Sequence, residues 1–179
     1  MEKLELRLYG LVPYQLTGIQ QGIQFGHAAI EYSIENFNSE IYQDWAKNWK
    51  TFIILNGGFS NQSSGGTMET HKNLLKENGI IFSSFYEPDL NDLLSAIVFL
   101  VDERVFDRQK YPDFDNKSFY GDHKMKYDEI YKDPMNPIFP SLCSLSGSMV
   151  RSEWDKWLES IGGKKNLFLR LFLKKFKLA

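Results

Sequence analysis

The sequence has a single cysteine, Cys143, among its 179 residues, and only three histidines. One cysteine cannot form an internal disulfide, and no Cys/His group has the spacing of a zinc site. No apolar run is long enough to span a bilayer, and the first residues, MEKLELRLYG, lack the continuous apolar segment of a signal peptide. We therefore predict a protein of the reducing cytoplasm, with no membrane partner, no metal and no other cofactor.

A strong excess of charge of either sign is also lacking. The chain has 21 basic and 23 acidic residues, for a formal net charge of -2. This balance gives no overall attraction to polyanions, so any contact with nucleic acid would need a local basic patch. The hydrophobic content of 42% and aromatic content of 15% are those of a globular protein rich in large core side chains.

Hydrophobic patterning predicts strands and helices in the order βααβαββ. Strands are expected at 4–12, 51–55, 80–86 and 95–101, and helices at 18–37, 39–49 and 68–78. The expected fold class is α/β, with three layers in which helices flank a mixed four-stranded sheet. Apolar residues recur at helical spacing in the first helix, and we expect this face to pack on the sheet: Ile19, Ile23, Ile30 and Ile34.

Two parts of the chain differ in character. Residues 1–104 hold the predicted core, and residues 105–179 are predicted to form an irregular and helical C-terminal extension packed on it. The stretch 107–140 is rich in Asp, Lys, Tyr and Pro, and a helix is expected at 152–161. The last segment, NLFLRLFLKKFKLA, combines apolar residues with lysines. It is interpreted as a terminal helix with solvated lysines, or as a contact for phosphate or a membrane surface.

Three polar residues form one stripe on the first helix. Gln20, Gln24 and His27 follow each other at i, i+4 and i+7, and Thr17 is a good N-cap just before them. The positive end of the helix dipole favours a phosphate or a developing oxyanion at this end. His27 can exchange a proton near neutral pH, and the amides can orient a substrate or water. A solvated helix face carrying one histidine explains the same spacing.

A second polar cluster follows the third predicted strand. The segment YEPDLND contains Glu87, Asp89 and Asn91, and Ser95 opens the next strand. A carboxylate here is suited to act as a base or to orient a histidine, and Ser95 to donate a hydrogen bond to a carbonyl or phosphoryl oxygen. A plain Pro/Asp/Asn turn explains these residues equally well. Asn56, at the start of a Gly-rich loop, is a further candidate for contact with a phosphate.

With these motifs in this order, the chain resembles the type II peptidyl-tRNA hydrolases. In GIQQGIQFGHAAIEY, which spans residues 18–32, Gln24 and His27 match a family helix that reads approximately G-K-x-x-x-Q-x-x-H-A-A. The segment ENGIIFSSFYEPDLNDLLSAIVFLV, residues 77–101, resembles the family's final helix end and strand pair, especially in a divergent branch with an E-P-D-x-x-x-x-x-T-A pattern. The resemblance covers about the first hundred residues.

The resemblance implies metal-independent cleavage of the ester that joins a peptide to tRNA, by a Lys and an Asp. Here Gln20 stands at the position of the family lysine, Glu87 or Asp89 at that of the aspartate, and Ser95 at that of a threonine. The missing lysine removes a positive charge that would hold a phosphate and stabilise the transition state. A smaller anionic substrate, such as a cyclic oligonucleotide signal, suits this acidic protein better than a tRNA.

The leading hypothesis is therefore a hydrolase of a nucleotide-containing substrate, either peptidyl-tRNA or a small cyclic oligonucleotide. His27 would act as acid or base, while Gln20 and Gln24 position substrate or water; Thr17, Asn56 and Asn91 are the candidates for substrate binding. The alternative is a protein that binds and sequesters a nucleotide or tRNA end without cutting it. A homodimer is left open. The terminal segment also resembles the ends of tailed bacteriophage proteins, which implies viral origin, action in the host cell cytoplasm and a role in counter-defence.

Overall fold

The computed structural model describes residues 3–61, 66–114 and 144–179, with only the backbone given for 144–151. Its centre is a mixed four-stranded sheet in the order β2-β1-β4-β3. The strands are β1 (Leu6–Val12), β2 (Thr51–Asn56), β3 (Phe82–Glu87) and β4 (Leu93–Asp102). β1 pairs parallel with β2, and β4 pairs antiparallel with both β1 and β3. The predicted α/β class and the mixed four-stranded sheet are confirmed.

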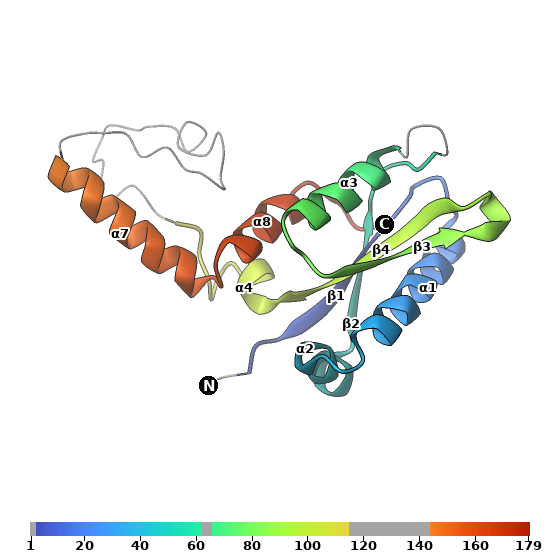
Figure 1. Cartoon of the computed structure of the whole chain (residues 1–179), viewed down its shortest axis with the longest axis horizontal. Helices are drawn as coiled ribbons and strands as arrows, with labels where there is room; N and C mark the ends of the chain where they lie inside the picture. The colour runs from blue at the N-terminus through green and yellow to red at the C-terminus, as the bar shows by residue number, and fades with distance from the viewer. Residues whose placement is uncertain (1–2, 62–65, 115–143) are drawn as a thin grey trace. The chain divides into compact units, whose positions relative to one another are not determined.

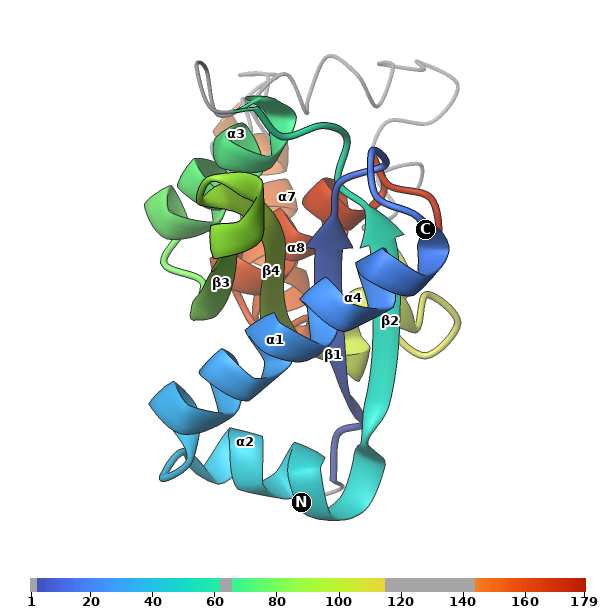
Figure 2. The ribbon, with the colours of Figure 1, turned by 90° about the vertical axis from the view of Figure 1, so that its right-hand side faces the viewer.

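Helices cover both faces of this sheet. On one face lie α1 (Gly18–Asn36), α2 (Glu40–Asp44) and the π-helical turn η1 (Trp45–Trp49), and Figure 2 shows α1 crossing in front of the strands. Their core with the sheet is made of large apolar side chains together with alanines: Leu6, Leu8, Val12, Phe25, Ala28, Tyr32, Trp45, Ala96 and Val98. On the opposite face, Met68 of α3 (Gly66–Glu77) and Leu11 of β1 both lie beside Gly57.

The buried face of α1 is not the predicted one. Ile19, Ile23, Ile30 and Ile34 are 80%, 50%, 60% and 70% exposed. The residues that α1 buries are Gln24, Phe25, Ala28 and Tyr32. The periodicity predicted the helix correctly, but packing against the strands determines which face is buried. Phe25 packs directly over Gly10, where a Cβ atom added to the glycine would lie 2.2 Å from the Phe25 ring. The expectation that the isoleucines pack on the sheet is wrong.

Three strands end at the same edge of the sheet. Because β4 runs antiparallel to both β1 and β3, those two strands point the same way, and β2 is parallel to β1. The carboxyl ends of β1, β2 and β3 and the start of β4 therefore share one edge, which we call the carboxyl edge. Ligands of open α/β sheets bind outside such an edge, and the loop from β1 places the N-terminus of α1 there (Figure 2).

The C-terminal tail is attached to the same edge. After α8 (Lys164–Leu173), Leu178 forms an antiparallel bridge with Leu55 of β2. Asn56 donates its backbone N–H to the carbonyl of Lys177 at 2.9 Å, and Ala179 donates to the carbonyl of Ile54 at 3.1 Å. This pairing covers the last three residues of β2 on the side away from β1, where Figure 2 shows the tail in red. The terminal helix predicted from the sequence therefore ends at Leu173, and the last three residues pair with β2 instead.

The chain divides into two compact units, residues 1–103 with 173–179, and residues 104–172 (Figure 1). The division falls beside the predicted boundary at 104/105, but the tail belongs with the first unit. The second unit contains α7 (Ser144–Ser160) and most of α8. Arg170, which is 1% exposed, is held there by the carbonyls of Arg104 and Tyr111 and by Asp113. Cys143 and residues 115–140 of the predicted irregular extension lie outside the described residues.

Two short helices complete the first half of the chain: η2 (Pro88–Leu90) lies in the turn from β3 to β4, and α4 (Glu103–Phe106) follows β4 directly. Within the described ranges, no helix is both long enough and apolar enough to cross a membrane.

Candidate functional site

The first helix begins with a complete capping box. Thr17 accepts the backbone N–H of Gln20 at 3.4 Å, and the Gln20 side-chain oxygen accepts the Thr17 backbone N–H at 3.0 Å. These bonds satisfy two backbone N–H groups at the helix start. The first turn carries no acidic residue, so nothing there offsets the positive end of the helix dipole. Gln20 is exposed, and its oxygen is occupied by Thr17, which leaves its amide N–H groups to meet a ligand.

Gln24 is the centre of a buried hydrogen-bond chain. Its side chain is on the inner face of α1 and only 6% exposed. The Gln24 Oε1 atom accepts a hydrogen bond of 2.7 Å from the hydroxyl of Ser95, and its Nε2 donates to the carboxylate of Glu87. An amide has one acceptor end and one donor end, so these two partners fix its orientation. The chain Ser95–Gln24–Glu87 joins α1, β4 and the end of β3.

A β-bulge turns the side chain of Ser95 toward α1. Phe85 pairs with Ala96, but Tyr86 pairs with Leu94, so Ser95 is left without a partner across the strands. Such an extra residue redirects its side chain. The Ser95 hydroxyl is fully buried, and it also lies 3.2 Å from the carbonyl of Phe85. Because Ser95 has no exposed surface, the structure does not place its hydroxyl to donate directly to a substrate oxygen, which was the expectation from the sequence.

His27 lies one turn further along α1, against Phe85. The ring centroids are 4.5 Å apart in an edge-on arrangement, and the His27 Nδ1 atom is buried without a hydrogen-bond partner. The sequence pattern favoured Glu87 or Asp89 as the residue that orients this ring. The structure instead directs Glu87 to Gln24 and to the backbone N–H of Asp89, 3.4 Å from Glu87 Oε1.

Every second residue of β3 contacts α1. Gln24 contacts Glu87, His27 contacts Phe85, and Glu35 accepts a hydrogen bond from Ser83. Ser83, Phe85 and Glu87 alternate on one face of the strand. His27 and Glu87 are therefore neighbours along this contact, with Glu87 at the carboxyl edge.

The remaining candidates of the second cluster lie in the turn from β3 to β4. Asp89 and Asn91 are exposed, and Asn91 adopts a left-handed backbone conformation with φ of 56°. The Glu87 carboxylate caps this turn as well as contacting Gln24. The capped turn confirms the turn explanation of these residues, and the functional explanation stays a prediction.

Asn56 closes a turn at the end of β2. Its side-chain oxygen accepts the backbone N–H of Gly58 at 2.9 Å, and the carbonyl of Gly58 accepts the N–H of Tyr14 from the loop before α1. The two loops at the ends of β1 and β2 are thereby tied together at the carboxyl edge, and the main chain of Lys177 lies beside Asn56.

The contact between the tail and α3 was not predicted from the sequence. His71 of α3 stacks edge-on against Phe176 with ring centroids 4.9 Å apart. Burial, and secondarily the charge of Lys175, lower the pKa of His71 below its usual value. The tail thus brings Lys175 and Lys177 to the part of the molecule where β2 ends. The only sequence signal for this was the mixture of aromatic residues and lysines in the last segment.

Among the described residues, no group of three or more His, Cys, Asp or Glu side chains is placed to hold a metal ion.

No protein-family model matches this chain, and no curated protein matches it with significant similarity. The resemblance to type II peptidyl-tRNA hydrolases therefore stays a prediction that depends on the motifs alone.

Proposed function

We propose that this chain is a hydrolase of a nucleotide-containing substrate, bound at the carboxyl edge beside the N-terminus of α1. The observation that carries the proposal is the buried chain Ser95–Gln24–Glu87. A glutamine that is almost completely buried must satisfy both ends of its amide. Here it does so by holding a carboxylate at the edge of the sheet where ligands bind in α/β folds.

In the proposed reaction, Glu87 removes a proton from a water molecule. The water oxygen attacks the carbonyl carbon of an ester or the phosphorus of a phosphodiester, and the bond to the leaving oxygen breaks. His27 gives that oxygen its proton. Gln24 and Ser95 position Glu87, while Gln20 and the positive end of α1 face the negative charge that develops on the substrate.

Cations for the phosphate groups are supplied by the tail. Gln20 is uncharged and stands where the type II peptidyl-tRNA hydrolases have a lysine. The positive charges near the carboxyl edge come instead from Lys175 and Lys177, in the tail that pairs with β2. This arrangement favours a small anionic ligand, such as a cyclic oligonucleotide, over a whole tRNA, because the basic patch is short. The proposed setting is the cytoplasm, which is the host cytoplasm if the chain is viral.

A second function is favoured by the same network. Gln24, Ser95 and Glu87 satisfy one another without a substrate, and Gln20 is engaged in the helix cap. A site of this kind can retain a nucleotide or a tRNA end without cutting it.

Incubation with peptidyl-tRNA and with cyclic di- and trinucleotides, followed by mass spectrometry of the products, tests both functions. Hydrolysis that is lost in His27→Ala and in Glu87→Gln supports the enzyme. The matched control is Asp92→Asn, which removes a carboxylate from the same exposed turn and should leave turnover unchanged. Tight binding with full recovery of intact ligand supports the sequestering protein. Neither turnover nor binding of any of these compounds would overturn both.

A further inference from the structure

The outer face of α1 carries an apolar ridge with no partner in the described part of the chain. Ile19, Ile23, Ile30 and Ile34 are each at least half exposed, and Phe37, just beyond the helix, is 63% exposed. Their angular positions at 100° per residue fall within one narrow stripe. A helix in a globular protein ordinarily turns such a stripe toward a core. Here Gln24, Phe25, Ala28 and Tyr32 occupy the core side instead.

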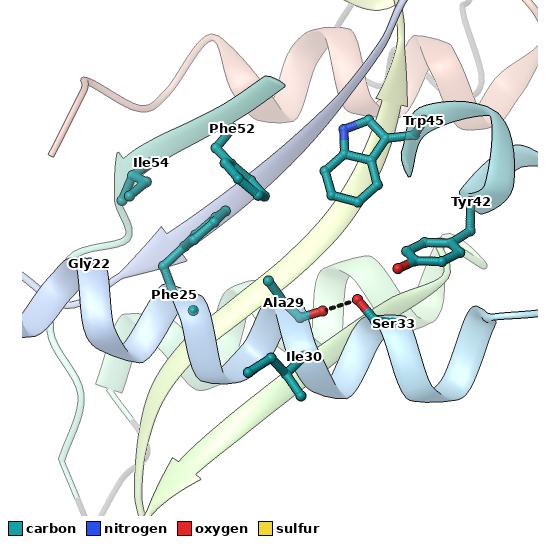
Figure 3. A pocket seen from close by; sticks show the side chains of 10 residues that line it. Gly22, Phe25, Ala29, Ile30, Ser33, Tyr42, Trp45, Phe52 and Ile54 are labelled. Carbon is teal, nitrogen blue, oxygen red and sulfur yellow. Dashed lines mark hydrogen bonds between the residues drawn. The ribbon is translucent and has the colours of Figure 1, made fainter. Parts of the chain in front are cut away.

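An apolar groove continues the ridge toward β2. It has a volume of about 580 Å³ and opens between α1, α2, η1 and β2. Phe25, Ala29 and Ser33 point from α1 toward Phe52, Trp45 and Tyr42 in this groove (Figure 3). Gly22 and Gly26 line its α1 side, and a Cβ atom at either glycine would meet nothing within 4 Å.

The spacing of the isoleucines is the same in both directions along the helix. Ile19 to Ile23 is four residues, Ile23 to Ile30 is seven, and Ile30 to Ile34 is four. When two such helices run antiparallel about a two-fold axis near Gly26 and His27, Ile19 of one copy faces Ile34 of the other, and Ile23 faces Ile30. An isologous interface requires a patch that is complementary to itself in this way.

The exposed area is that of a dimer interface. The five exposed residues of the ridge together with Phe52, which is 52% exposed, present on the order of 700 Å² of side-chain surface, close to the roughly 800 Å² per partner of a standard interface. The largest apolar patch on a typical monomer is about 300–600 Å². Gly26 at the centre lets two backbones approach closely, because no side chain stands between them.

We propose that two copies of this chain pair through α1, antiparallel, with the two-fold axis at Gly26 and His27. The ridge faces away from Gln24 and the sheet, so the pairing leaves the buried chain Ser95–Gln24–Glu87 as it is, while His27 of each copy comes to lie beside the two-fold axis. The inference does not depend on the proposed function.

Sedimentation velocity of the full chain over a range of concentrations tests the pairing. We expect a species of twice the mass of the chain, and Ile23→Glu should weaken its formation on the order of 100-fold, as for a central interface residue. The matched control is Ile81→Glu, which places the same charge on an isoleucine that is 62% exposed elsewhere in the chain and should leave the dimer intact. A chain that stays monomeric at every concentration overturns the proposal, as does a dimer that Ile23→Glu leaves unchanged.

Cysteine cross-linking tests the direction of the helices. In a Cys143→Ser background, a mixture of Ile19→Cys and Ile34→Cys chains should form a disulfide between copies. Ile19→Cys alone should not, since an antiparallel pair separates the two copies of this residue by about 15 rises of 1.5 Å along the helix. Cross-linking of Ile19→Cys with itself would show a parallel pair and overturn the antiparallel arrangement.

Discussion

Ser95 and Gln24, which are 71 positions apart in the sequence, meet through a buried hydrogen bond of 2.7 Å. The bond depends on the bulge that turns Ser95 out of the strand alternation and toward α1. It leaves the donor end of the Gln24 amide for Glu87. The bulge in the sheet therefore helps to position the Glu87 carboxylate, because Ser95 orients Gln24 and Gln24 binds Glu87. The same hydrogen bonds contribute to the stability of the fold.

Replacing Gln24 with leucine should destabilise the protein by about 1–3 kcal/mol, because the buried Ser95 hydroxyl and the Glu87 carboxylate each lose one of their hydrogen-bond partners. The free energy of unfolding in urea measures the effect. Gln21→Ala is the control, since the Gln21 side chain on the same helix donates one hydrogen bond, 3.2 Å to the carbonyl of Pro13, and its loss should cost less than about 1 kcal/mol. Equal losses in the two variants would contradict the central role of Gln24.

Replacing Gly10 with alanine should destabilise the fold by about 1–3 kcal/mol, the usual cost of overpacking a core. The new Cβ atom would lie 2.2 Å from Cδ2 of Phe25. Gly22→Ala is the comparison, because a Cβ there meets nothing within 4 Å and alanine is favoured over glycine inside a helix by about 0.5–1 kcal/mol. Urea unfolding at concentrations that keep the chain monomeric should give opposite signs for the two variants. Adding Phe25→Leu to Gly10→Ala should restore part of the loss.

Attachment of the C-terminal tail should weaken as the pH falls. The pKa of His71 is lowered in the folded state by burial and by Lys175. The His71 ring therefore binds a proton more readily in the unfolded chain than in the folded one. The stability that the neutral ring contributes is present above the ordinary histidine pKa of about 6.5, and it is lost as the pH falls through the pKa of His71 in the folded state. Amide exchange should show falling protection of Ala179 and Asn56, whose N–H groups pair the tail with β2.

The variant His71→Gln should remove this dependence on pH, since glutamine does not titrate. Protection factors at Ala179 that stay constant from neutral pH down to about pH 5 in the natural sequence would contradict the prediction.

Ligand retention should depend on the lysines of the tail. The double variant Lys175→Gln and Lys177→Gln should weaken the binding of any nucleotide ligand, and for a tRNA-derived ligand the slope of log K against log salt should fall by about one for each lysine. Titrations at several salt concentrations measure both effects. Lys47→Gln is the control, because Lys47 is exposed on η1, before the start of β2 and so at the opposite edge of the sheet. An unchanged slope in the double variant would show that the tail does not contact the ligand.

The candidate site was predictable from the sequence in part. Gln24, Glu87 and Ser95 were each expected from motif positions, and the structure joins them in one network. The motif pattern gave no indication that Glu87 would bond to Gln24 instead of His27, or that Ser95 would be buried. Those outcomes depend on a bulge and on the register of β3 against β4, and register is set by pairing between distant segments.

Local signals along the chain were sufficient to predict the order of the elements, the α/β class and the capped start of α1, because these depend on periodicity, caps and turns. Which face of α1 lies inside was settled by packing between distant segments. The sequence pattern favours the isoleucine face as the buried one. The opposite face is buried instead, because Gly10 leaves room for the Phe25 ring and because Gln24 hydrogen-bonds to Glu87 and Ser95. A local pattern cannot reveal this choice, since it is made by the strands that the helix covers and, in our proposal, by the second copy that covers the isoleucines.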